Sequence, residues 1–113
     1  MLLAGVIEAS EEKQAPLILA IHPDELMFVR PSFIKAAREE AIHATIPVCI
    51  HLDHGASLAH IMQAIQCGFT SVMMDGSLLP LDENIKVCKE IVAIAHAVNV
   101  SVEGELSTIG MTG

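Results

Sequence analysis

The sequence predicts a single α/β domain in which parallel strands alternate with helices. Short apolar runs, typical of strands buried on both faces, alternate along the chain with longer segments whose apolar residues recur at the helical period. The expected strands begin near residues 17, 47, 71 and 100, and each interval between them is long enough to hold a helix. Strands connected in this way are parallel, and their crossovers are right-handed. Because the 113 residues contain no repeat, low-complexity tract or linker, we expect residues 1–113 to form one domain.

The composition excludes several classes of protein. Hydrophobic residues make up 52% of the chain and the mean hydropathy is +0.54, which is too apolar for a disordered segment. The chain carries 6 Lys and Arg residues against 14 Asp and Glu residues, for a formal net charge of −8. Nucleic acids and anionic membrane surfaces are bound by clustered basic residues, so neither is an expected partner. Three cysteines lie among apolar neighbours, which favours reduced thiols in a cytoplasmic protein.

Neither export nor membrane insertion is expected. The first residues lack the basic start and the small-residue cleavage site of a secretory signal. The uncharged run from His54 to Met74 is long enough to span a bilayer, but it contains several polar residues and two glycines. This run is therefore better divided into a helix and a strand.

The first half of the chain contains two predicted helices and two predicted strands. Residues 2–13 place apolar residues on one side and acidic residues on the other, which indicates a helix that Pro16 ends. Leu17–Ile21 is a short apolar run typical of a buried strand. Pro31 begins the second helix, and Pro47–Leu52 is the second strand. On the second helix, the residues expected to face inward are Phe33, Ile34, Ala37, Ala41 and Ile42.

The second half repeats this alternation. Ser57 is expected to cap a third helix that ends at Gly68, and Ser71–Met74 is the third strand. The longest helix runs from about Pro80 to Val98, with proline near its start and acidic residues in its first turn. Val100–Glu105 is the last strand. The residues expected to face inward are Leu58, Ile61, Met62 and Ile65 on the third helix, and Ile85, Cys88, Ile91, Val92 and Ala95 on the longest helix.

The positions of polar residues within the strands point to one edge of the sheet. Successive strand side chains point to opposite faces, so Val48, Ile50 and Leu52 share one face of the second strand. Cys49, His51 and Asp53 share the other face, and the same parity holds in the next two strands. Three neighbouring strands therefore each carry a carboxylate at the carboxyl end, opposite the aliphatic face that helices would cover. These carboxylates are Asp53, Asp75 and Glu105.

Three carboxylates at one edge favour a bound cation. In a parallel barrel the face opposite the helices is the interior, and catalytic groups lie at the carboxyl ends of the strands. Carboxylates held a few Å apart cannot all remain ionised cheaply, so a metal ion or a proton is expected among them. His54 directly follows Asp53, and a neutral imidazole beside carboxylates is a suitable zinc ligand.

Structural interpretations of the same residues stay open. His51, Asp53 and His54 are equally compatible with a hydrogen-bonded corner at the strand end, and Asp75 with a turn in which it caps its own backbone. Glu103 and Glu105 would be exposed if the sheet were open at that edge. His22 follows the first strand at the same edge, and its role is undecided. The remaining histidines, His43, His60 and His96, are expected on helix surfaces.

Four segments of the chain resemble the class II, zinc-dependent ketose-bisphosphate aldolases, which include the fructose- and tagatose-bisphosphate enzymes. The resemblance covers nearly the whole chain in order and spacing, and four linked motifs are far more specific than one. The segments are His51-Leu52-Asp53-His54-Gly55, Gly68-Phe69-Thr70-Ser71-Val72-Met73-Met74-Asp75-Gly76-Ser77, Glu83-Asn84 and Ser101-Val102-Glu103-Gly104-Glu105-Leu106.

The resemblance implies a parallel (β/α)8 TIM barrel of which residues 1–113 supply about half, from the first helix to the fifth strand. It implies cleavage of a ketose 1,6-bisphosphate to dihydroxyacetone phosphate and glyceraldehyde 3-phosphate, with Zn2+ polarising the ketone and stabilising the enediolate. By the same resemblance Asp53 is the proton donor and His54 binds the catalytic zinc. Asp75 and Glu105 fall on a second metal position.

Length bears on this expectation, because a (β/α)8 barrel takes about 250 residues. Residues 1–113 lack the first strand and the last three strands of the family, and with them two further zinc histidines and the phosphate-binding loops. We therefore expect a fragment that is inactive alone, or a half-barrel that works in a homo-oligomer or with a separate remainder of the barrel. A non-enzymatic α/β module that binds a metal or a partner is the alternative from a different class.

Overall fold

The computed structural model describes residues 2–26 and 30–106. Its strands are β1 (Leu17–Ile21), β2 (Val48–Gly55), β3 (Ser71–Met74) and β4 (Ser101–Gly104). Its helices are α1 (Leu2–Glu12), α2 (Pro23–Leu26), α3 (Pro31–His43), α4 (Leu58–Cys67) and α5 (Leu81–Ala97). The strands form one sheet in the order β1-β2-β3-β4, and every pair is parallel. The predicted parallel α/β fold is confirmed.

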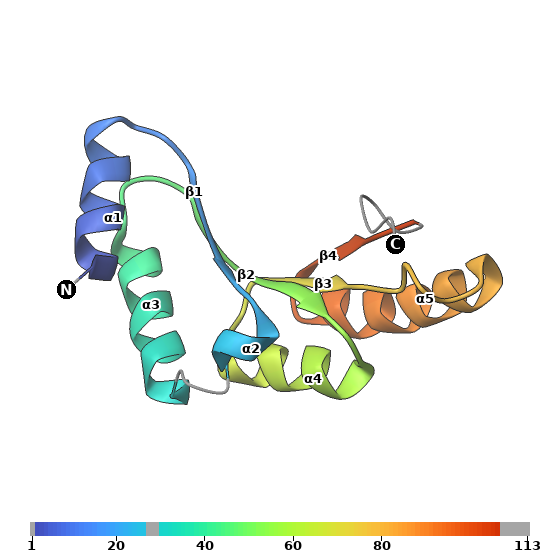
Figure 1. Ribbon diagram of the computed structural model, residues 1–113. Coiled ribbons are helices and arrows are strands. Elements are labelled where there is room, and N and C mark those ends of the chain that lie inside the picture. Colours follow the sequence, from blue (N-terminus) through green and yellow to red (C-terminus); the bar gives the residue numbers. More distant parts are fainter. Residues whose placement is uncertain (1, 27–29, 107–113) are drawn as a thin grey trace.

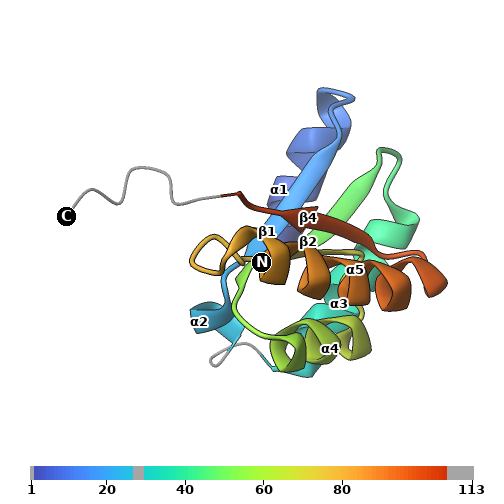
Figure 2. The ribbon, with the colours of Figure 1, turned by 90° about the vertical axis from the view of Figure 1, so that its right-hand side faces the viewer.

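The helices cover one face of this sheet. Figure 1 shows α3, α4 and α5 following one another along that face, and Figure 2 shows the same layering after a 90° turn. α1 packs beside α3 at the β1 end. Because every neighbouring pair of strands is parallel, the carboxyl ends of all four strands lie at one edge of the sheet. We call this edge the carboxyl rim, formed by residues 22–24, 53–55, 75–77 and 105.

The core lies between the sheet and the helices, as strand parity predicts. Ile50 and Leu52 of β2 are fully buried on the helix side, while His51 and Asp53 point to the opposite face. Each fully buried aliphatic or aromatic side chain stabilises the fold by roughly 1.5–3 kcal/mol. The largest fully buried side chains are Phe69, Ile34, Ile50, Leu52, Ile61, Ile91 and Val72.

Both predicted ends of α4 are confirmed. The Ser57 hydroxyl accepts a hydrogen bond of 3.2 Å from the His60 N–H, which satisfies one of the free donors in the first turn. Gly68 closes the helix with a left-handed backbone (φ 108°), and its N–H donates to the carbonyls of Ala64 and Ile65. Glycine adopts this conformation at little cost.

The bounds of two strands differ from the sequence prediction, and one short helix was not predicted. β2 continues to Gly55, whereas the prediction ended it at Leu52, because the strand stays paired with β3 beyond a break in register. β4 comprises Ser101–Gly104, because these are the residues that pair with β3. It is shorter than the predicted Val100–Glu105. The four-residue helix α2 has no periodic pattern long enough to read from the sequence, and it was not predicted.

Four residues predicted to face inward are instead exposed. Phe33, Ile42, Leu58 and Ile85 have exposed fractions of 37, 65, 39 and 46%. A helical period gives the direction of an apolar stripe but not its width. The narrower buried stripe of α4 centres on Ile61 and Ala64, so Leu58 lies at its margin.

The outer edges of β1 and β4 carry no further strand within the described residues. An apolar cavity of about 540 Å³ lies between α5 and the end of β4, and a second of about 340 Å³ lies along β1, α1 and α3. The three cysteines are half-buried free thiols. Among the helices described, none is both long and apolar enough to cross a membrane.

Candidate metal centre at the carboxyl rim

The structure brings together His54, Asp75 and Glu105 from three consecutive strand ends. Each offers one ligand atom, and these three atoms lie within 4.8 Å of one another. His54 Nδ1 lies 3.1 Å from Asp75 Oδ2, within hydrogen-bond distance. One imidazole nitrogen and two carboxylate oxygens at this spacing are a donor set that suits a divalent cation such as Zn2+. The residues present therefore fit a metal ion.

An irregularity at the end of β2 aims two consecutive side chains at this rim. Neighbouring residues of a regular strand point to opposite faces, yet His54 Nε2 lies 3.8 Å from Asp53 Oδ1. The register with β3 shifts between Leu52 and Gly55, and His54 has a left-handed backbone (φ 49°). Such a break in pairing bends a strand and redirects its side chains, and it is often found next to functional sites.

A hydrogen bond and close backbone packing hold the end of β2 against the end of β3. The Asp75 N–H donates to the Gly55 carbonyl over 2.8 Å, immediately beyond His54. A Cβ at Gly55 would lie 2.7 Å from both the Ile61 side chain and the Met73 carbonyl, so the close approach of β2 and β3 requires glycine there.

The two oxygens of Asp75 have different partners. Oδ1 accepts hydrogen bonds from the Ser77 hydroxyl at 2.6 Å and the Ser77 N–H at 3.2 Å, whereas Oδ2 faces His54. The capped turn considered from the sequence is therefore present, and it coexists with the contact to histidine. The Ser77 hydroxyl bond first, and then the bond with His54, lowers the pKa of Asp75 from 3.8 to about 2.

The electrostatics of His54 mark the position of a cation. The hydrogen bond with Asp75 is the main cause of a pKa of His54 raised above its ordinary 6.5. Burial, the second-largest cause, opposes this rise, and the negative charges of Asp53, Asp75 and Glu105 add to it. Without a metal, a proton on His54 is what balances the surrounding carboxylates.

A second group on the inner face was not recognised as a cluster from the sequence. His51 Nδ1 lies 2.8 Å from Ser71 Oγ, and His51 Nε2 lies 3.7 Å from Glu103 Oε1, across β2, β3 and β4. Ligand atoms of His51, Asp53 and Glu103 also lie within 4.8 Å of one another. The alternation of side chains along each strand places all of these residues on one face. It does not show that His51 pairs with Ser71, which follows from the register of β2 and β3. The hydrogen bond between His51 and Ser71 is a contact that the structural-corner interpretation predicts, and the spacing of His51, Asp53 and Glu103 also suits a cation.

His22 lies at the same rim. Its ring centroid is 5.9 Å from that of His54, and its Nδ1 accepts a hydrogen bond of 3.2 Å from the Asp24 N–H. Sequence analysis left His22 undecided, and the structure places it at the edge of the candidate centre.

Comparison with known proteins adds independent evidence. The family model for class II fructose-bisphosphate aldolase matches residues 1–113. A fructose-bisphosphate aldolase of Giardia intestinalis is 44% identical over 110 residues, which are 96% of this chain and 34% of the relative. A 6-phospho-5-dehydro-2-deoxy-D-gluconate aldolase of Bacillus licheniformis is 46% identical over 111 residues, which are 94% of this chain and 38% of the relative. The chain thus spans little more than a third of the length of these curated relatives.

Solved structures agree with this result. The YdjI aldolase of Escherichia coli K12 superposes with a TM-score of 0.84 at 36% identity, covering 92% of this chain and 40% of that one. A fructose-bisphosphate aldolase of Campylobacter jejuni gives a TM-score of 0.75 at 24% identity, covering 98% and 39%, and supports the fold alone. The four parallel strands and their helices are about half of a (β/α)8 barrel. With its whole length matched by one family model, this chain belongs to the class II fructose-bisphosphate aldolase family.

Proposed function

We propose that the carboxyl rim forms part of the catalytic centre of a zinc-dependent aldolase. The substrate is a ketose 1,6-bisphosphate, fructose or tagatose bisphosphate, and the products are dihydroxyacetone phosphate and glyceraldehyde 3-phosphate. The observation that carries this proposal is the convergence of His54, Asp75 and Glu105 within 4.8 Å at the rim of a family member.

The metal ligands are assigned by the resemblance to the class II aldolases. His54 is the ligand of the catalytic zinc, and Asp75 and Glu105 hold a second metal position. When bound, Zn2+ polarises the ketone carbonyl as a Lewis acid. The two carboxylates repel each other at this separation, and a bound cation reduces this electrostatic repulsion. In the metal-free centre, a proton on His54 provides the compensating positive charge.

Asp53 is the residue that exchanges a proton with the substrate. Its side chain is 39% exposed and lies beside His54, so a bound sugar phosphate can reach it. In the cleavage direction its carboxylate takes the proton of the C4 hydroxyl as the C3–C4 bond breaks and the aldehyde forms. In the condensation direction the resulting carboxylic acid returns that proton to the aldehyde oxygen.

A second candidate substrate follows from the relatives. The identities to the fructose-bisphosphate aldolase and to the 6-phospho-5-dehydro-2-deoxy-D-gluconate aldolase differ by only two percentage points, 44% against 46%. A phosphorylated keto acid is therefore the alternative to a ketose bisphosphate, with the same rim residues in the same roles.

The remaining parts of the centre are expected from further strands. One histidine cannot supply the three protein ligands of the usual catalytic zinc site. We propose that a second copy of the chain or the remaining barrel half covers the open edges of β1 and β4 and completes the centre.

The test is release of triose phosphate by purified, zinc-loaded protein. Each of the three phosphorylated substrates is supplied in turn, and product is followed with a coupled dehydrogenase. We expect Asp53→Asn and His54→Ala to lower activity by at least about 100-fold, while the exposed-surface control His96→Ala leaves it unchanged. Zinc binding with no cleavage of any of the three would overturn completion of the centre by a second copy of the chain, and would favour an inactive fragment or the non-enzymatic metal-binding module.

A further inference from the structure

Asn84 is a buried polar residue to which the proposed chemistry gives no role. It lies in the second turn of α5 and is 5% exposed. A buried amide destabilises a protein unless its donors and acceptor are hydrogen-bonded. The partners of Asn84 therefore show what its burial achieves.

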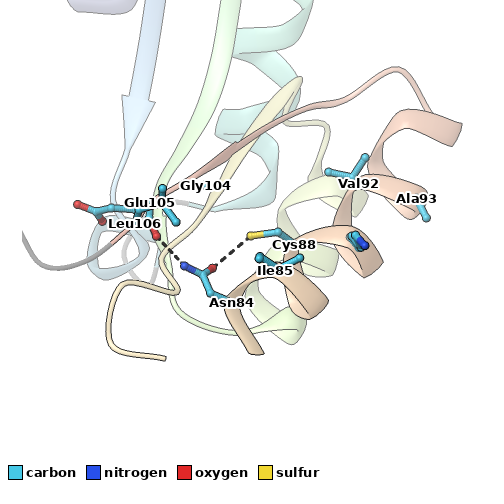
Figure 3. A pocket seen from close by; sticks show the side chains of 9 residues that line it. Asn84, Ile85, Cys88, Val92, Ala93, Gly104, Glu105 and Leu106 are labelled. Carbon is cyan, nitrogen blue, oxygen red and sulfur yellow. Dashed lines mark hydrogen bonds between the residues drawn. The ribbon is translucent and has the colours of Figure 1, made fainter. Parts of the chain in front are cut away.

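The Asn84 amide bonds to the chain immediately after β4. Its Nδ2 donates to the main-chain carbonyl of Glu105 over 2.8 Å, and Cys88 Sγ donates to its Oδ1 over 3.4 Å (Figure 3). The Glu105 carbonyl can only accept a hydrogen bond, so the bond to it alone fixes which way the amide points. Glu105 is the residue after the last one paired with β3, so this bond from a helix holds Glu105 where the sheet ladder has ended.

The other side of the amide packs against the segment that carries Asp75. A Cβ added to Gly76 would lie 2.8 Å from Asn84 Cγ, closer than real Cβ contacts occur. A side chain at residue 76 would therefore displace the buried amide of Asn84. One side chain is wedged between the neighbour of Asp75 and the backbone of Glu105.

Packing alone does not hold Glu105 in place. The apolar cavity of about 540 Å³ opens beside it, lined among others by Ile85, Cys88, Val92 and Leu106 (Figure 3). With this space on one side, the chain at residues 105–106 has room to move if the bond to Asn84 is removed.

Resting on the metal site of the proposed function, we propose that Asn84 is a positioning residue for that site. Asp75 and Glu105 follow separate strands, so their separation depends on what connects the two strand ends. The Asn84 amide makes that connection, through Gly76 on one side and the Glu105 carbonyl on the other. It fixes the distance between the carboxylates without touching the metal.

Zinc affinity of the full chain tests this role. Zn2+ alone is titrated against a chromophoric chelator for wild type, Asn84→Ala, Asn84→Leu and Gly76→Ala. Removing a hydrogen-bond partner of a metal ligand typically weakens metal binding by about 10- to 100-fold, and we expect about tenfold for each variant. Asn84→Leu keeps the branched arrangement of side-chain heavy atoms but removes the amide, so it separates the hydrogen bonds from the presence of a side chain. Co2+ absorption spectra should change in the same three variants.

Two matched controls distinguish positioning from general stability. Cys88→Ala removes the sulfur partner but keeps the bond to Glu105, and Ile91→Val loosens the core beneath α5. Both should keep wild-type zinc affinity even where the melting temperature of the metal-free chain falls.

The two proposals fail in different ways. Wild-type affinity in Asn84→Leu and Gly76→Ala, with binding lost in His54→Ala and Asp75→Asn, overturns the role of Asn84 and leaves the metal site intact. Wild type that binds no zinc, or His54→Ala that binds it as well as wild type does, overturns both.

Discussion

His54 combines a left-handed backbone with a side chain that faces three carboxylates. A non-glycine residue at φ 49° carries backbone strain, and such residues concentrate at functional sites. The strain and the altered register of β2 together let His54 and Asp53 share the rim. The strained backbone of His54 therefore lowers the stability of the fold while it directs the imidazole toward the carboxyl rim.

The strain at His54 predicts a difference between two substitutions. His54→Ala and His54→Gly both remove the imidazole, but glycine adopts the left-handed conformation freely. We expect His54→Gly to be more stable than His54→Ala by about 1 kcal/mol. Urea unfolding of the metal-free variants measures this difference, and equal stabilities would contradict the strain.

Zinc affinity should depend on pH through His54. The imidazole must be neutral to bind zinc, and its pKa is raised above 6.5 by Asp75 and the nearby charges. Affinity should therefore fall by about tenfold for each pH unit below that raised pKa. Titrations across this range measure the midpoint. In Asp75→Asn, the pKa of His54 in the metal-free chain, followed by NMR, should move back toward its ordinary value.

The His54–Asp75 pair should also make the stability of the metal-free chain depend on pH. The raised pKa of His54 gives stability that is present below 6.5 and lost as the pH rises through the raised value. The lowered pKa of Asp75 gives stability that is present above 3.8 and lost as the pH falls toward about 2. Asp75→Asn should therefore destabilise the chain more at about pH 5 than at about pH 8. Urea unfolding at both values tests this sign.

At the scale of elements, the helix ends were readable from the sequence and the end of β2 was not. Ser57 and Gly68 act on their own backbone, so their residue types suffice to predict where α4 begins and ends. The register shift after Leu52 arises from pairing with a strand about 20 residues later. Histidine is enriched among non-glycine residues with positive φ, but such residues are uncommon, so the residue type of His54 does not by itself predict a left-handed backbone.

The same distinction applies to the candidate centre. Parity placed Asp53, Asp75 and Glu105 at one edge, because alternation is a property of each strand alone. The contacts of His51 with Ser71 and Glu103 depend on the register of the strands. The hydrogen bond of the buried Asn84 amide depends on where α5 lies against the sheet. Those are properties of the assembled sheet, which no single segment encodes.

The caps of α4 predict stability changes that spare the rim. Ser57→Ala removes a hydrogen bond to the first turn and should cost about 1 kcal/mol. Gly68→Ala strains a φ of 108° and brings a Cβ within 3.3 Å of the Arg38 side chain, so it should cost at least as much. Urea unfolding measures both losses. Zinc affinity should stay at the wild-type value, and a loss of it would show that α4 also positions the metal site.

At the scale of the whole molecule, two open strand edges and two apolar cavities favour association. Eight parallel strands close a barrel of this kind, and two copies of a four-stranded sheet supply eight. An uncovered parallel edge also invites pairing with another chain. We therefore expect the purified chain to associate with itself.

Light scattering tests this expectation. The wild-type chain should have at least twice the monomer mass, and Ile85→Lys, in the cavity beside β4, should shift it toward the monomer. Ile42→Lys is the matched control, because Ile42 is 65% exposed on α3 and lines neither edge cavity described above. A monodisperse wild-type monomer would contradict self-association.

The order of the sheet also bears on how the chain folds. Each strand pairs with the next strand in the sequence, and the helix between them packs on that pair. Paired strands are therefore separated by a single crossover each, which limits the entropy lost in closing each loop. The β1–α3–β2 unit can form while later units are still being synthesised, and each new strand then adds to an existing edge. During synthesis, each strand that leaves the ribosome can therefore pair with the strand that precedes it in the sequence.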